Sequence, residues 1–278
     1  MELVVCLLFG LAIGSFLNVC IARLPLDESV VSPRSRCPNC RKLIAGYDNI
    51  PVFSYLILGG RCRNCKKPIS ARYPLIELLT GVISVMLYLK FGLTLEWGIY
   101  LIFSAALVTL GFIDIDHRIL PDVITLNGIW LGILVGVALA TPSSFVSGLL
   151  QYEGYFGLSP RWIAFLSSLA GLVVGGGMLW LAGEIFFRVR GIEGMGFGDV
   201  KMMAMVGAFL GVPLVLFTIL AGSILGAIIG IVLIKLGGKE RHYELPFGTF
   251  LSIAAILAVL YGDSLINWYY VHMIQPAL

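Results

Sequence analysis

Long apolar segments separated by short polar connections run along almost the whole chain. Segments apolar enough to cross a hydrocarbon core of about 30 Å fall at roughly 2–22, 74–91, 95–113, 122–140, 161–187, 198–212, 214–236 and 246–262. The pattern predicts an all-α polytopic membrane protein with about eight transmembrane helices. Gly211-Val212-Pro213 interrupts residues 198–236, which form either a bent hairpin or a long span with a re-entrant piece.

Composition supports the same class. The chain has 278 residues, 59% of them hydrophobic and 13% charged, with a mean hydropathy of +0.96. This composition is far outside the range that is typical of soluble domains. The first segment begins Met1-Glu2 without a basic n-region, and its basic residue, Arg23, follows it. We therefore expect this segment to stay as a membrane anchor rather than to be cleaved as a signal peptide.

The distribution of Lys and Arg predicts the orientation. Ten of the nineteen lie between the first and second spans. Seven more fall where eight alternating spans place them on the same side, namely Arg118, Arg188, Arg190, Lys201, Lys235, Lys239 and Arg241. Only Lys90 and Arg161 lie opposite. By the positive-inside rule the crowded side is cytoplasmic, and both termini face the periplasm. The net charge of +3 then reflects topology, so we expect membrane lipid and no nucleic acid as a partner.

The connection at 23–72 carries two Cys-x-x-Cys motifs with 21 residues between them, formed by Cys37, Cys40, Cys62 and Cys65. This spacing resembles that of a zinc ribbon, in which each motif gives two thiolates to one tetrahedral ion. A short loop buries little core, so a metal would help it to fold. We expect a structural zinc site; a pair of disulfides is the alternative, but it needs an oxidising compartment, which the charge pattern does not favour.

Two aspartates interrupt the apolar segments. Asp199 opens the sixth predicted span, and Asp114 lies where the third span runs into a short connection. An acid in a membrane is costly and is a functional candidate by default. The third span runs inward and the sixth outward, so both acids reach the cytoplasmic face. Two such carboxylates can share a proton and activate a water for attack on a peptide carbonyl.

Other polar residues near these spans have less specific interpretations. We expect Asp116 and Asp122 to be solvated or capping residues, with Asp122 at the start of the fourth span, and His117 to face solvent. Lys201 either snorkels to the headgroups, which we favour, or biases the charge of the acid pair. Glu77 enters the second span, where it either pairs with a loop Arg or lines a polar site at the cytoplasmic face.

The order and spacing of these motifs resemble the type IV prepilin peptidases, bacterial inner-membrane enzymes of the GxGD aspartic protease class. The resemblance covers nearly the whole chain and rests on Gly14-Ser15-Phe16-Leu17-Asn18-Val19, the two cysteine motifs, Asn49-Ile50-Pro51, Leu58-Gly59-Gly60-Arg61-Cys62, Tyr73-Pro74-Leu75-Ile76-Glu77, the segment from Asp114 to Asp122, and Gly194 to Lys201. Many members of that family have Lys where this chain has Arg61, which keeps the charge.

The resemblance implies two enzymatic activities and assigns roles to individual residues. It makes Asp114 and Asp199 the catalytic pair, with Gly196-Phe197-Gly198-Asp199 as the GxGD motif. It implies cleavage of the short basic leader of type IV prepilins and pseudopilins at the cytoplasmic face. S-adenosylmethionine would then donate a methyl group to the new N-terminal residue, which is usually Phe. The expected parts are a first transmembrane helix (1–22), a cytoplasmic tetracysteine zinc domain (23–72) and a transmembrane aspartic peptidase core (73–278).

The methyl-donor site is not evident from the sequence. The chain shows no glycine-rich loop between a strand and a helix, and its connections are too short for a Rossmann unit. Two other functions compete with a peptidase. A transporter or channel with a zinc-stabilised loop would also carry paired membrane acids, but near the midplane and with inverted repeats. A non-catalytic membrane scaffold could use the zinc loop to bind a partner.

Overall fold

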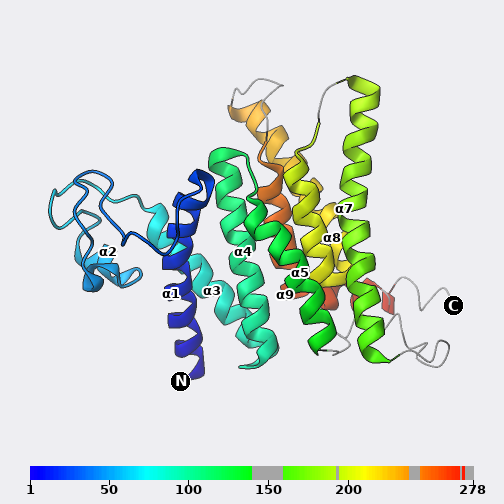
Figure 1. Ribbon diagram of the computed structural model, residues 1–278, viewed down its shortest axis with the longest axis horizontal. Helices are drawn as coiled ribbons and strands as arrows, with labels where there is room; N and C mark the ends of the chain where they lie inside the picture. The colour runs from blue at the N-terminus through cyan, green and yellow to red at the C-terminus, as the bar shows by residue number, and fades with distance from the viewer. Residues whose placement is uncertain (140–158, 192–193, 238–244, 270, 273–278) are drawn as a thin grey trace. The chain divides into compact units, whose positions relative to one another are not determined.

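The computed structural model describes residues 1–139, 159–191, 194–237, 245–269 and 271–272 (Figure 1). These residues form two compact units, Met1–Ile113 and Asp114–Leu278. Among them, helices dominate and strand pairing is limited to two isolated bridges, Arg36 with Leu43 and Arg61 with Pro68. Lys239 and Arg241, which the charge pattern assigns to the crowded side, lie outside the described residues.

Six described helices are long and apolar enough to cross a membrane, and a seventh, shorter helix is also apolar. Their outward surfaces carry many large hydrophobic side chains, which would be unfavourable in water but suit a lipid environment. The protein is therefore an all-α polytopic membrane protein, as the sequence predicts.

The first unit packs α1 (Glu2–Arg23) against α3 (Arg72–Phe91). The Ser84 hydroxyl of α3 donates a hydrogen bond to the Cys6 carbonyl of α1 at 2.7 Å. Satisfying a buried polar group in this way avoids a desolvation cost. The loop between the two helices contains the short elements η1 (Leu24–Leu26), η2 (Gly46–Asn49) and α2 (Phe53–Ile57). Helix α4 (Leu95–His117) runs from the first unit into the second, which begins at Asp114.

The second unit contains α5 (Asp122–Leu139), α7 (Pro160–Arg190), α8 (Phe197–Gly237) and α9 (Phe247–Tyr269). Helix α8 contacts α5, α7 and α9 (Figure 1). Its buried face near the N-terminal end is rich in Met and small residues, including Met202, Met203 and Met205, which are almost fully buried. This packing places the first turn of α8 next to the first turn of α9, where the candidate site lies.

Helix α8 is interrupted at Gly211-Val212-Pro213, where the sequence left two interpretations open. A continuous 41-residue helix would be about 60 Å long, twice the thickness of a hydrocarbon core. The helix is broken at Gly211, whose φ of 72° and ψ of 178° are not helical and suit glycine because it has no Cβ. The predicted spans 198–212 and 214–236 are thus two helical segments joined at a break.

Candidate active site and metal centre

Asp114 and Asp199 lie at helix ends in the second unit. Asp114 is in the last turn of α4, and Asp199 is in the first turn of α8. Their side chains are only 6% and 8% exposed. A carboxylate in the first turn of a helix is favoured by the helix dipole. Gly198, which precedes Asp199, faces Leu120: a Cβ at this position would lie 3.0 Å from the Leu120 Cβ, so the glycine permits this close approach.

Gly248 in α9 lies close to both carboxylates. A Cβ placed on Gly248 would be 2.9 Å from Asp199 Oδ1 and 3.1 Å from Asp114 Oδ2. Oxygens of both acids therefore approach the same position, the one that a side chain at residue 248 would occupy. The structure brings together the two aspartates that the sequence singled out from distant spans, and any side chain at position 248 would crowd both of them.

Thr249 holds Asp114 in place. Its backbone N–H donates a hydrogen bond to Asp114 Oδ2 at 2.8 Å, and its hydroxyl donates to the same oxygen at 3.1 Å. Thr249 is in the first turn of α9, where unsatisfied backbone N–H groups and the helix dipole favour an anion. Three helix ends thus meet at the site: the C-terminal end of α4 and the N-terminal ends of α8 and α9.

Sequence reasoning missed Gly248 and Thr249. Both lie just inside the predicted span 246–262, in Leu245-Pro246-Phe247-Gly248-Thr249. The only local signal is a proline followed by a glycine and a hydroxyl residue at a helix start. Such a pattern is common at helix N-termini for structural reasons alone, so nothing in it indicates a carboxylate neighbour.

The residues around the pair fall close to their expected places. Asp122 lies in the first turn of α5, and His117, the last residue of α4, is exposed. Lys201 Nζ lies 2.7 Å and 2.8 Å from the two oxygens of Asp122, a pairing that neither interpretation of Lys201 anticipated. The pairing joins the first turns of α5 and α8 beside the candidate site.

The four cysteines of the loop form one cluster. Their sulfur atoms all lie within 4.8 Å of one another, and Cys37 Sγ and Cys65 Sγ, from different motifs, are 3.9 Å apart. Zinc–sulfur bonds of about 2.3 Å in a tetrahedron require sulfurs about 3.8 Å apart, so the arrangement could hold one zinc ion. All described cysteines are free thiols, so the structure offers no support for the disulfide alternative.

The two cysteine motifs have the same local structure. Cys37 N–H donates to the Lys42 carbonyl at 3.0 Å, and Cys62 N–H donates to the Lys67 carbonyl at 2.9 Å. The residue after each second cysteine has a left-handed backbone, with φ of 57° at Arg41 and 59° at Lys66. In the second motif, hydrogen bonds from the backbone N–H groups of Cys65 and Asn64 lower the pKa of Cys62 to about 6. A thiolate favoured in this way is the form that binds metal.

Glu77 is a further acid, for which the sequence left two interpretations open. Only 8% of its surface is exposed, and its Oε2 accepts a hydrogen bond from the Val52 N–H at 2.7 Å. Among the described residues, Glu77 forms no ion pair with a Lys or an Arg. Glu77 also lines a cavity between its own helix and the cysteine loop. The second of the two interpretations, a polar site, is therefore the one that the structure favours.

Comparison with known proteins identifies the family. Residues 8–91 match the model of the bacterial peptidase A24 N-terminal domain, and residues 101–231 match that of the type IV leader peptidase family. The chain is 36% identical to the prepilin leader peptidase/N-methyltransferase of Pseudomonas aeruginosa, covering 95% of this chain and 91% of that protein. The protein of the same name from Aeromonas hydrophila is 39% identical, with 94% and 91% covered.

The protein of this name from Myxococcus xanthus is 42% identical, with 83% of this chain and 62% of that protein covered. No solved structure matches the chain. The two family models together account for both the loop that carries the cysteine cluster and the helices that carry Asp114 and Asp199. The chain therefore belongs to the type IV leader peptidase family.

Proposed function

We propose that this protein is a membrane-embedded aspartic peptidase that removes the basic leader from type IV prepilins and pseudopilins and then methylates the new N-terminus. The observation that carries the peptidase activity is the convergence of Asp114 and Asp199 on Gly248. Two buried carboxylates close to one glycine are an arrangement that can activate a water and protonate a leaving group.

The surroundings of the two acids suggest how they divide the work. Thr249 donates two hydrogen bonds to Asp114, and such bonds stabilise negative charge on a carboxylate. Asp114 is therefore the better candidate for the base that takes a proton from the attacking water. Asp199 would protonate the amine that leaves when the peptide bond breaks. Because Gly248 has no side chain, it would leave room beside the two acids for the water and the scissile carbonyl.

The protein would lie in the bacterial inner membrane, with the proposed site at the cytoplasmic face. The meeting of the two acids requires that the end of α4 and the start of α8 lie at the same side, as the charge pattern predicts. That pattern gives this side most of the Lys and Arg residues, which favours the cytoplasm. A short basic leader would be found on this side, and both termini of the enzyme would be periplasmic.

The residues that would hold the proposed zinc ion belong to the first unit. Cys37, Cys40, Cys62 and Cys65 would hold zinc with all four positions filled by protein, which is typical of a structural site. S-adenosylmethionine would supply an electrophilic methyl group to the amine that cleavage exposes. The enzyme must bind this donor close to the loop or helices without a Rossmann unit, since the described residues contain only isolated strand bridges.

The test is a reaction with a purified substrate. The enzyme, in lipid nanodiscs and loaded with zinc, is incubated with a prepilin whose basic leader ends in Gly before Phe, with and without S-adenosylmethionine. Mass spectrometry of the product should show a new N-terminal Phe, heavier by one methyl group only when the donor is present. An intact precursor in both reactions would contradict the peptidase assignment, and cleavage without methylation would contradict the second activity alone.

A further inference from the structure

The first unit contains a cavity of about 700 Å³ that the peptidase assignment does not use. Its lining comes from α1 between Ser15 and Arg23, from the start of α3 up to Glu77, and from both cysteine motifs. A volume of this size lies within the range of small-molecule sites, and it is far too large for a single ion. The cavity and the cysteine cluster share a wall, because Cys37 and Cys62 line both.

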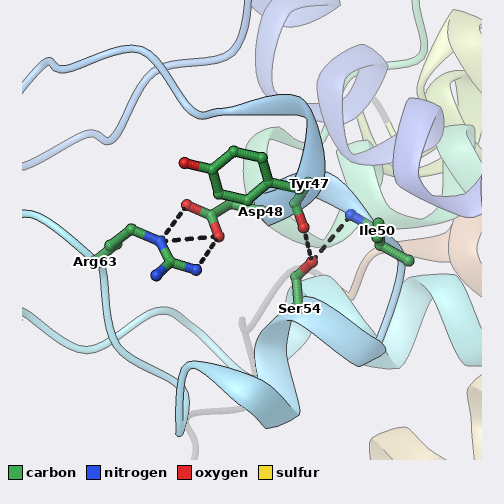
Figure 2. Close-up of polar contacts among 5 residues, drawn as sticks. All are labelled: Tyr47, Asp48, Ile50, Ser54 and Arg63. Atoms are coloured by element: carbon green, nitrogen blue, oxygen red, sulfur yellow. Dashed lines mark hydrogen bonds and ion pairs between the residues drawn. The ribbon is translucent and has the colours of Figure 1, made fainter.

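One wall of the cavity is fixed by a polar cluster (Figure 2). The Ser54 hydroxyl donates to the Tyr47 carbonyl at 2.9 Å and accepts from the Ile50 N–H at 3.0 Å. Asp48 binds Arg63 of the second cysteine motif through three contacts of 2.6 to 3.1 Å. Hydrogen bonds from this guanidinium hold the pKa of Asp48 below its usual value, so the pair is ionised at neutral pH and ties this wall to the metal cluster.

Glu77 supplies negative charge at the inner side of the cavity. It is more than nine-tenths buried and has no ion-pair partner among the described residues. The Val52 N–H that it binds belongs to a tight turn, in which Phe53 N–H donates to the Pro51 carbonyl at 2.6 Å. Val52 has φ of 61° and ψ of −50°, values that are unfavourable for a β-branched residue. Such strain persists where the surroundings hold it and is concentrated at functional sites.

The remaining lining complements a ligand with three different chemical groups. Besides Glu77, it includes the rings of Tyr47, Tyr55 and Tyr73, and the cationic side chains of Lys42 and Lys67. S-adenosylmethionine combines a sulfonium cation, a carboxylate and a flat adenine ring. An acid without an ion-pair partner attracts the cation, lysines attract the carboxylate, and aromatic rings provide flat apolar surface.

We infer that this cavity binds S-adenosylmethionine and that Glu77 provides the negative charge for the sulfonium group. The inference rests on the proposed methyl transfer and adds where the donor binds. It places the donor in the first unit, whereas the aspartate pair belongs to the second. The zinc cluster would then also support the donor site, because losing the metal would disturb one wall of the cavity.

The first experiment locates the donor directly. Zinc-loaded enzyme in nanodiscs is irradiated with ultraviolet light in the presence of radiolabelled S-adenosylmethionine, digested, and mapped by mass spectrometry. The label is expected on peptides within residues 15–77 and should be lost when excess S-adenosylhomocysteine competes. A competable label confined to peptides within 101–231 would overturn the inference.

The second experiment tests the charge of Glu77. S-adenosylhomocysteine is a neutral thioether that lacks the sulfonium charge, so Glu77→Gln should weaken binding of S-adenosylmethionine about tenfold or more and binding of S-adenosylhomocysteine much less. Glu28→Gln, at an exposed position of the same loop outside the cavity, should change neither affinity. Equal weakening of both ligands by Glu77→Gln, or no weakening, would contradict the role of Glu77.

The two experiments separate this inference from the proposed function. An enzyme that methylates its product but is labelled outside residues 15–77 retains the function and loses the inferred site. An enzyme that cleaves the precursor, contains zinc and binds no S-adenosylmethionine at millimolar concentration contradicts methyl transfer itself. If Glu77→Gln fails to fold, as judged by zinc content and thermal unfolding, the labelling of the unmodified protein still decides the location.

Discussion

Replacing Thr249 with Val tests whether α9 helps to orient the catalytic pair. The substitution removes the hydroxyl that donates to Asp114 Oδ2 at 3.1 Å and keeps the backbone N–H that donates at 2.8 Å. Valine has nearly the same shape as threonine, so little packing is lost. A hydrogen bond to a charged group contributes about 1.5–3 kcal/mol. If the bond acts fully in the transition state, its loss lowers kcat by about 10- to 150-fold, at about 1.36 kcal/mol per factor of ten.

The assay is steady-state leader cleavage in nanodiscs, from which kcat and KM are obtained separately. Thr249→Val should lower kcat with little change in KM, and Thr249→Ser, which keeps the hydroxyl, should recover most of the rate. Thr218→Val is the matched control, because Thr218 is also buried but its hydroxyl donates to the Leu214 carbonyl of its own helix at 2.7 Å. Equal rates for Thr249→Val and the unmodified enzyme would refute the positioning role, as would an equally slow Thr218→Val.

Three further predictions follow from other features of the structure. Gly248→Ala should lower kcat by about 100-fold or more, because its Cβ would lie 2.9 Å and 3.1 Å from the two carboxylates and small displacements of reacting groups are costly. Val52→Gly should stabilise the protein by about 1 kcal/mol in thermal unfolding, because strain of about 1–3 kcal/mol is relieved and backbone entropy costs about 0.5–1 kcal/mol. Cys40→Ser should reduce the bound zinc, measured by mass spectrometry of the metal, to well below one equivalent.

Each of these variants has a control in the chain. Gly177→Ala, at a helical position with open space around its Cβ, should cleave normally; a Gly248→Ala enzyme of equal activity would show that the room beside the two acids is not needed. Ile50→Gly changes a residue with ordinary φ of −72° and should destabilise, so an equal loss in Val52→Gly would argue against strain. Cys6→Ala should keep its zinc, and a Cys40→Ser protein that does the same would exclude the tetracysteine site.

The sequence was sufficient to predict the helices and the acid pair. Apolar segments of membrane-spanning length are a strong signal, and the charge pattern was enough to predict that Asp114 and Asp199 share a face. The path of the chain at the break in α8 could not be predicted, because a Gly-Val-Pro sequence is compatible with both a bent hairpin and a long span with a re-entrant piece. The non-helical backbone angles of Gly211 show where the helix is interrupted, which the residue types alone do not.

The residues that contact Asp114, Asp199 and Glu77 could not be predicted, because each contact arises only when the chain is folded. Gly248 and Thr249 are small uncharged residues at a helix start, and they become part of the site only because α9 packs where α4 ends and α8 begins. Glu77 binds the N–H of Val52, and a backbone partner leaves no pattern of residue types to detect. The unusual conformation of Val52 is likewise a result of the folded loop, since β-branched residues rarely adopt it alone.

The most direct test of the account is leader cleavage by Asp114→Asn and Asp199→Asn enzymes. Both variants keep the size of the side chain and remove its ability to ionise or donate a carboxylic proton. Each purified protein is incubated with the prepilin, and the N-terminus of the product is read by mass spectrometry, with zinc content and thermal unfolding as measures of folding. The account predicts folded proteins that leave the precursor intact, and complete cleavage by either variant would contradict it.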